Sequence, residues 1–220
     1  TLASGGTLGI TSTAGITSAG ATGNIQVTGA RSYNTAANYT YNGSAAQASG
    51  NGLPATVNNL TINNSAGVNL IAGSTVNGAL TLTSGTLGVG TTTLLLNSTV
   101  NSTGGTISSA ATGTVNYAQS SNGQNVVAGT YGNLIFSNFN KSLASSGTIG
   151  IAGTFTTGTA TGHTISGSSL DFNGAGSQTI PAFNYNNLTS SSTGARILAA
   201  SSTIGIASAF TPGTNAYTIT

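Results

Sequence analysis

Charged residues are almost missing from this sequence. Of its 220 residues, three are basic and one is acidic, so that 2% of the chain is charged. A globular domain ordinarily carries about 25% charged residues, and a surface of interspersed Lys and Glu is therefore excluded. The basic residues Arg31, Lys141 and Arg196 lie far apart in the sequence. Nucleic-acid binding requires clustered Lys and Arg, so the net charge of +2 does not indicate a nucleic-acid partner.

Cysteine and methionine are absent as well. Without Cys there is no disulfide and no thiolate metal site, and the sequence gives no indication of its redox compartment. Since position 1 is not Met, we expect that the chain begins after a processed signal or is a segment of a larger protein. The longest aliphatic run is Leu94–Leu96, whereas a membrane helix needs about 20 apolar residues. We therefore expect no membrane span.

The shortage of carboxylates also bears on catalysis. Hydrolytic or lyase chemistry normally needs paired carboxylates, or a carboxylate with Lys or Arg, and Asp171 is the single acidic residue. We expect no enzyme, no cofactor and no metal site, since a calcium site made of oxygen ligands also needs several carboxylates. We expect His163 to be a solvent-facing polar residue rather than a base. For Asp171, Lys141 and Arg196 we expect plain solvation beside turns, with an ion pair across coils as the alternative.

What the sequence does contain is repetition. Residues 143–151 read LASSGTIGI, and residues 2–10 and 198–206 each match this nine-residue motif at seven of nine positions. A looser copy starts at Leu70. Two further motifs precede the nine-residue motif in constant order. The first is an aromatic residue with Asn-Gly and a later Gln, as at Tyr41 and Gln47, and the second is an Asn-Leu pair, as at Leu60. The chain is therefore an array of repeats, and its spacing predicts about 17 to 18 residues per coil.

Coils of this length accommodate three short strands joined by tight turns. Leu60-Thr-Ile62 and Leu80-Thr-Leu82 alternate apolar residues with Thr, which places the aliphatic side chains on one face. We predict an all-β fold, a right-handed parallel β-helix (β-solenoid) of about twelve short coils, as a single array over residues 1–220. Residues 28–54 are rich in Tyr and Asn and are expected to leave the solenoid as a loop. The residues expected to point into the core are Leu60, Ile62, Leu80, Leu82, Leu134, Ile149, Ile151, Ile204 and Ile206.

The succession of these motifs resembles the tandem repeats of long secreted bacterial surface proteins, which are adhesin-like β-solenoids rich in Gly, Thr, Asn and Ser. The resemblance covers nearly the whole chain, and it implies an extracellular or cell-surface structural protein, a subunit of a self-assembling filament or an adhesin stalk. The alternative is an ice- or carbohydrate-binding solenoid. For ice binding the Thr-x-Thr pattern recurs at block-sized gaps and forms no continuous ladder. For carbohydrate binding the expected glycan contacts are Tyr33, Tyr39 and Tyr41.

Self-association is the expected partnership, because an open solenoid leaves unpaired backbone groups at each end. The terminal stretches carry no Lys, Arg, Asp or Glu that would protect these ends. The net charge of +2 is near zero, so little long-range repulsion keeps two copies apart. We predict a head-to-tail homopolymer, joined either by stacked ends or by a donated strand, with surface glycans as a further possible partner. The expected subunit contacts are Leu2, Leu8, Ile10, Phe210, Tyr217 and Ile219.

Overall fold

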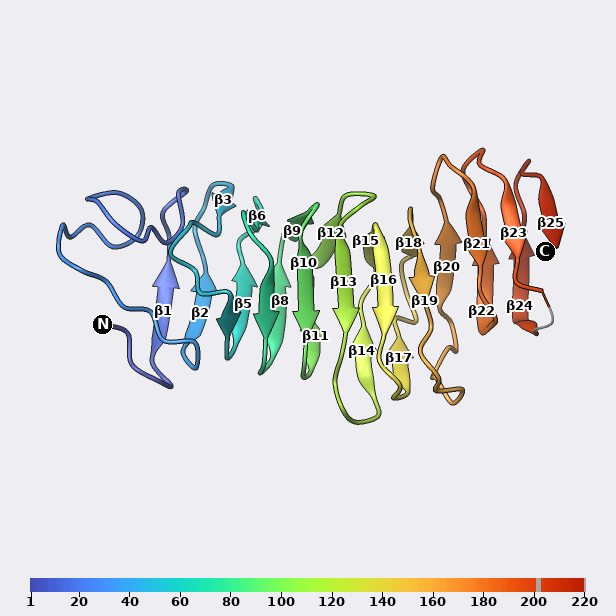
Figure 1. Cartoon of the computed structure of the whole chain (residues 1–220), viewed down its shortest axis with the longest axis horizontal. Coiled ribbons are helices and arrows are strands. Elements are labelled where there is room, and N and C mark those ends of the chain that lie inside the picture. The colour runs from blue at the N-terminus through green and yellow to red at the C-terminus, as the bar shows by residue number, and fades with distance from the viewer. Residues whose placement is uncertain (201–202, 220) are drawn as a thin grey trace. The chain divides into compact units, whose positions relative to one another are not determined.

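The computed structural model describes residues 1–200 and 203–219. Every regular element in these residues is a β-strand, and none of them forms a helix. The fold is a parallel β-solenoid of about nine turns (Figure 1), so the predicted fold class is confirmed. Ser201 and Ser202, which belong to the third copy of the nine-residue motif, lie outside the described residues.

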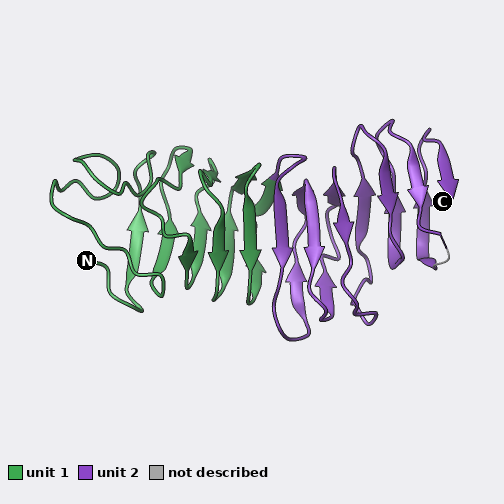
Figure 2. Ribbon diagram, in the orientation of Figure 1, with its two compact units in different colours: residues 1–108 green, residues 109–220 purple. Residues whose placement is uncertain are grey.

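The chain divides into two compact units, residues 1–108 and residues 109–220 (Figure 2). In unit 1 the strands β1-β2-β5-β8-β11 lie in this order in one sheet. The strands β4, β7 and β10 pair in a second row, and β3, β6 and β9 in a third, all in parallel. The strands of this unit are β1 (Thr7–Ile10), β2 (Asn38–Tyr41), β3 (Gln47–Ala48), β4 (Thr56–Val57), β5 (Leu60–Asn63), β6 (Val68–Asn69), β7 (Ser74–Val76), β8 (Leu80–Ser84), β9 (Thr86–Gly90), β10 (Thr93–Leu96), β11 (Val100–Ser102) and β12 (Thr106–Ser109), whose last residue falls in unit 2.

Unit 2 has the same construction. Its parallel rows are β13-β16-β19, β15-β18-β20-β22-β24, β14-β17 and β21-β23-β25. The strands of this unit are β13 (Thr114–Tyr117), β14 (Gln124–Val126), β15 (Gly129–Tyr131), β16 (Asn133–Phe136), β17 (Lys141–Leu143), β18 (Ile149–Ile151), β19 (Phe155–Thr156), β20 (Ser169–Phe172), β21 (Gln178–Ile180), β22 (Phe183–Thr189), β23 (Arg196–Leu198), β24 (Ile204–Thr211) and β25 (Tyr217–Ile219).

The coils are longer than the sequence predicts. In the strand register Leu60 aligns with Leu80, Leu170 with Leu188, and Leu134 with Phe155. These pairs put most coils at roughly 18 to 21 residues instead of about 17 to 18. The longer step is one reason for about nine turns where about twelve are expected. Glycine closes several corners: at Gly85, with φ of +75°, an added Cβ would lie 1.8 Å from the carbonyl oxygen of Asn64.

The excursion from the solenoid lies earlier than expected. Thr7 of β1 aligns with Asn38 of β2, so the first coil is much longer than the others, and residues 11–37 contain only an isolated bridge at Tyr33. Within the expected loop at 28–54, β2 and β3 follow the regular coil path. The reason is that Tyr39-Thr-Tyr41 alternates as Leu60-Thr-Ile62 does, with both Tyr rings inside and the Thr outside. Aromatic residues here replace aliphatic core residues and do not mark a loop.

Seven of the nine residues expected in the core are buried, from Leu60 to Ile151, each no more than 1% exposed. The two exceptions are Ile204, which is half-buried, and Ile206, which is 38% exposed. Both lie on β24, the last strand of its row, so no further strand of the described chain covers their outer side. The register explains the contrast, because Ile206 aligns with Tyr185, which is fully buried one coil earlier.

Core packing can be tested on one residue with a matched control. Leu80 is fully buried, whereas Ile71 is 52% exposed. We expect Leu80→Ala to lower the free energy of unfolding by about 2 to 5 kcal/mol, because it removes buried methyl groups and leaves a cavity. Ile71→Ala should change it by less than about 0.5 kcal/mol. Urea unfolding followed by circular dichroism measures both, and equal losses would show that the inward register is misassigned.

Candidate functional site

The Gln of the repeated Asn-Gly motif forms a hydrogen-bonded clamp between coils. Gln47 accepts a bond from the backbone N–H of Gly43 (3.0 Å) through its Oε1. Its Nε2 donates to the carbonyl oxygens of Ile10 (3.0 Å) and Ser12 (2.9 Å), which belong to the preceding coil. Gln47 is 2% exposed. One side chain thus satisfies three buried or part-buried backbone groups at a corner, where strand pairing is interrupted.

The same clamp recurs in unit 2. Gln178 Oε1 accepts from the N–H of Gly174 (2.7 Å), and its Nε2 donates to the carbonyl oxygens of Ile151 and Gly153 (2.9 Å each). Ile10 and Ile151 close equivalent copies of the nine-residue motif, so the repeats seen in the sequence are equivalent in structure too. The motif therefore carries a structural task. We call the side chains at this motif position the polar ladder, although Gln47 and Gln178 lie on different rows of strands and Gln47 aligns with Val68 one coil later.

Arg196 continues the polar ladder, aligned with Gln178. It is fully buried, and its Nη2 donates to the carbonyl oxygens of Phe172 (2.7 Å) and Gly174 (3.2 Å) on the preceding coil. The expectation that Arg196 is solvated is therefore wrong, because the guanidinium takes over the donor role of the Gln amide. Burial lowers the pKa of Arg196, while Tyr217 and Asp171 oppose this effect. Its remaining bonds go to Ser190 Oγ and to the carbonyl oxygens of Gly176, Gly194 and Ala195.

Lys141 occupies the ladder position too, because it aligns with Gln124 of the preceding coil. It is 1% exposed, so the expectation of a solvated side chain is wrong here as well. Its Nζ donates to Ser137 Oγ (2.7 Å). Burial lowers the pKa of Lys141 to about 8. A buried ammonium with no carboxylate beside it is a cost to folding at neutral pH.

Asp171 forms no ion pair within the described part of the chain. Its Oδ1 accepts from the backbone N–H of Ser191 (2.9 Å) and its Oδ2 from the Ser191 hydroxyl (2.5 Å). The carboxylate thus joins two neighbouring coils on the outer surface. Among residues 1–200 and 203–219, no group of three His, Cys, Asp or Glu side chains gathers in a way that could hold a metal ion.

His163 is half-buried and not solvent-facing. Its Nε2 lies 2.9 Å from the carbonyl oxygen of Ala160, and since that oxygen can only accept, Nε2 carries the proton. Its Nδ1 accepts from the backbone N–H of Lys141 (3.0 Å). Burial lowers the pKa of His163, and the nearby Lys141 adds to this effect, although the bond to Ala160 opposes it. At neutral pH the ring is uncharged and both nitrogens hold backbone groups in place.

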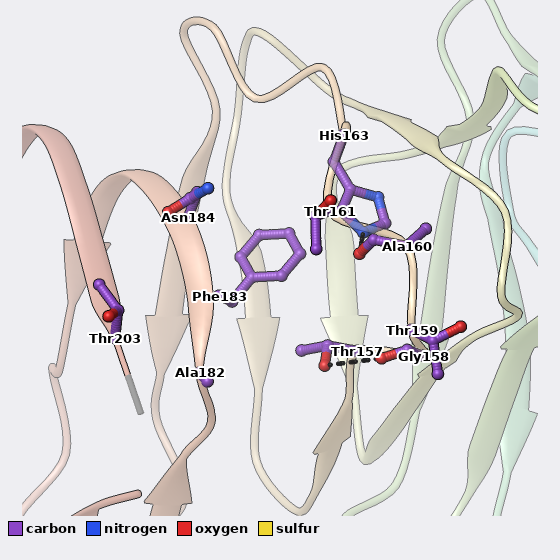
Figure 3. Close-up of a pocket in the computed structure, with 10 residues that line it drawn as sticks. All are labelled: Thr157, Gly158, Thr159, Ala160, Thr161, His163, Ala182, Phe183, Asn184 and Thr203. Atoms are coloured by element: carbon purple, nitrogen blue, oxygen red, sulfur yellow. Dashed lines mark hydrogen bonds between the residues drawn. The ribbon is translucent and has the colours of Figure 1, made fainter. Parts of the chain in front are cut away.

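A pocket of about 260 Å³ opens beside this histidine (Figure 3). The ring of Phe183 lies between the His163 loop on one side and Asn184 on the other. Phe183 is 7% exposed and is fixed by edge contacts with Phe155 (5.3 Å) and Tyr185 (5.1 Å). The rest of the lining is Thr157, Gly158, Thr159, Ala160, Thr161, Ala182 and Thr203. Among the described residues, no formally charged side chain lines the pocket, so its chemistry suits a small, neutral, polar ligand.

The tyrosines expected to bind glycans are placed differently. Tyr39 and Tyr41 are fully buried, and their hydroxyls donate to the carbonyl oxygens of Asn34 (2.8 Å) and Ser49 (2.7 Å). Burial raises the pKa of Tyr39 to about 12 and that of Tyr41 well above its ordinary value. Their rings offer no face to a sugar, so this expectation is corrected. Tyr33 is half-buried, and its hydroxyl donates to the carbonyl oxygen of Thr17 (3.3 Å).

The residues expected at subunit contacts fall into two groups. At the N-terminal coil Ile10 is fully buried, which removes it from any contact surface, while Leu2 and Leu8 are half-buried. At the C-terminal coil Phe210 is 46% and Ile219 is 76% exposed, and Tyr217 is half-buried with its ring 5.7 Å from that of Phe210.

On the five-stranded row of unit 1, Thr40, Thr61 and Thr81 align in one outward column.

Comparison with known proteins found no family model, no curated protein and no solved structure that matches this chain. In the described part of the chain no helix is long and apolar enough to cross a membrane.

The buried ammonium of Lys141 makes stability depend on pH. Its pKa falls from 10.5 to about 8 on folding, so between these values the unfolded state binds more protons, and the free energy of unfolding rises with pH. Below about pH 8 the cost of burying the charge is fully present. We expect Lys141→Gln to raise the melting temperature at pH 7, and the difference from wild type to shrink from pH 8 to 10.5. Melting curves at several pH values test this, and a difference independent of pH would contradict it.

Proposed function

We propose that this chain is a non-catalytic structural protein of the cell exterior, a filament subunit or an adhesin stalk. The observation that carries the proposal is the polar ladder. In other proteins such polar side chains bind ligands. Here they donate to the carbonyl oxygens of the preceding coil, as seen for Gln47, Gln178 and Arg196. The secreted, adhesin-like repeats that the sequence resembles support the same role. In such a protein the solenoid itself is the functional element, because stacked coils act as a spacer.

The proposed partner is a second copy of this chain, joined head to tail. The support comes from the last coil, where β24 and β25 stand at the ends of their rows and carry the exposed side chains Ile206, Phe210 and Ile219. An unpaired strand edge is a template for another strand unless charge or Pro blocks it. Residues 203–219 contain no charged residue and a single proline, Pro212. Stacked ends and a donated strand are both compatible with this edge.

Self-assembly is tested with one substitution at the edge and one away from it. We expect wild-type protein to sediment as growing oligomers with rising concentration, and electron microscopy to show filaments. Ile219→Lys places a charge on the exposed edge and should leave folded monomers, since a buried, unpaired ammonium opposes the joint. Ile71→Lys, at another exposed apolar position, should assemble like wild type. A wild-type protein that stays monomeric at high concentration refutes the head-to-tail proposal.

Carbohydrate binding is the second candidate function, and the pocket beside Phe183 favours it. Hydroxyl and amide groups around a small apolar patch, where Phe183 exposes 7% of its surface, suit a neutral sugar, which has one apolar face and many hydroxyls. The pocket volume of about 260 Å³ is below the range of about 300 to 1,000 Å³ for drug-sized ligands, which favours a single sugar ring. Ice binding has less support, since the outward column of Thr40, Thr61 and Thr81 ends at Gly9 and Asn101.

Sugar binding is tested by calorimetric titration of neutral oligosaccharides. If one binds, we expect Asn184→Ala to weaken it by about 10-fold, because a hydrogen bond to the ligand is worth roughly 1.4 kcal/mol. Asn97 carries an amide on the outer surface of unit 1, so Asn97→Ala should leave the affinity for the sugar unchanged. Absence of binding, or equal affinity in both variants, removes this candidate.

A further inference from the structure

The outer edge of β1 is not free. β1 is the first strand of its row and pairs with β2. At the two ends of this pairing, the N–H of Asn38 donates to the carbonyl oxygen of Gly6 (2.8 Å) and that of Asn42 to the carbonyl oxygen of Ile10 (2.9 Å). Along a strand the backbone groups of successive residues point alternately to the two edges. The carbonyl oxygen of Gly9 and the N–H of Thr11 therefore point to the outer edge, away from β2.

Asn24 occupies these two groups. Its Nδ2 donates to the carbonyl oxygen of Gly9 (2.9 Å), and its Oδ1 accepts from the N–H of Thr11 (2.9 Å). A residue of a preceding parallel strand would bond to the same pair of groups through its own N–H and C=O. The carboxamide of Asn24 thus replaces one residue of a neighbouring coil and protects the edge against another strand.

Asn24 belongs to a lobe, residues 18–31, and the chain on either side of this lobe is fixed by hydrogen bonds. On one side Ile16 is fully buried and bonded to Ser49 (3.1 Å), and on the other Leu2 is bonded to Ser32 (2.8 Å). Arg31, at the end of the lobe, donates to the carbonyl oxygen and hydroxyl of Thr17 (2.8 and 2.6 Å), the residue that precedes the lobe. It also donates to the carbonyl oxygens of Gly20 and Val27. The lobe is therefore closed on itself and is joined to the edge of β1 through Asn24.

The packing of the lobe on the coil beneath it is incomplete. A cavity of about 190 Å³ lies between Ile25 and Val27 of the lobe and the half-buried side chains of Leu2 and Leu8. Val27 is 50% exposed. Little apolar surface would therefore return to water if the lobe moved away, and Leu2 and Leu8 would become available to a better-fitting partner.

We propose that residues 18–31 form a displaceable cap over the outer edge of β1, and that β24 of a second copy takes the place of Asn24 when the copies join. This inference rests on the proposed head-to-tail assembly. The partner is argued from β24, an end strand of eight residues that exposes 38% of Ile206 and 46% of Phe210. These side chains would meet Leu2 and Leu8, and neither edge carries a charge that opposes the contact.

The cap is tested without relying on filaments. A fluorescent peptide of residues 203–219 serves as the incoming strand, and its binding is measured by anisotropy. We expect Asn24→Ala to bind it at least 10-fold more tightly than wild type, and Asn97→Ala to behave as wild type. The same peptide with Ile206→Lys should not bind. By hydrogen exchange, the amide of Thr11 should lose protection in Asn24→Ala and regain it with the peptide.

The outcomes separate the two proposals. Equal affinity of the peptide for wild type and Asn24→Ala, or no renewed protection of Thr11, overturns the cap, whatever the state of assembly. Tight binding to Asn24→Ala in a protein that never forms filaments supports the cap and refutes head-to-tail assembly. If Asn24→Ala does not fold, Arg31→Gln loosens the lobe without touching β1 and should raise peptide affinity in the same direction.

Discussion

The structure depends on the pairing of every buried backbone group with the coil next to it. Parallel strands achieve this on the flat faces, but strands of two to eight residues leave gaps at each corner. Side-chain amides fill those gaps: Gln47 reaches Ile10 and Ser12, and Gln178 reaches Ile151 and Gly153. A thin core of Leu, Ile, Val, Tyr and Phe then suffices, since few buried side-chain polar atoms lack a partner in the described part of the chain. Hydrogen bonding at the corners between strands, more than the volume of the core, therefore determines which sequences adopt this fold.

The same constraint explains why cations lie inside a protein with a single carboxylate. Arg196 has five N–H donors, and its six bonds end on five carbonyl oxygens and one hydroxyl. The charge is dispersed among backbone dipoles, so no acidic partner is required. Lys141 has the same position with a point charge and fewer donors. Arginine is thus a better replacement for Gln in the polar ladder than lysine.

The sequence predicts the fold well where its pattern is local. Alternation at Leu60-Thr-Ile62 indicates an inward face, and the repeated motifs indicate coils. It misplaces Tyr39 and Tyr41, because a stretch rich in Tyr and Asn is typical of a loop, whereas the alternation of these residues is that of a strand. It also misplaces Lys141 and Arg196, because charge is normally a sign of exposure.

The buried position of Lys141 and Arg196 had a sequence signal, whereas two other features of the structure had none. Lys141 follows Gln124 by one coil, and Arg196 follows Gln178 by one coil, so their spacing could have indicated the ladder position. The pocket at Phe183 and the contact of Asn24 with β1 have no sequence signal, since both arise from the path of loops.

The short coil step also has a kinetic consequence. Apart from the long first coil between β1 and β2, each strand pairs with one about 20 residues away in a chain of 220. Sequence separation is therefore roughly one tenth of the length, a value typical of fast-folding helical proteins and unusual for an all-β protein. Folding can therefore start at any coil and spread from there to the neighbouring coils. Adding or removing a whole coil changes the length of the chain without changing the closure entropy of any other coil. Such a protein can lengthen during evolution by duplication, at little cost to the rate at which each coil folds.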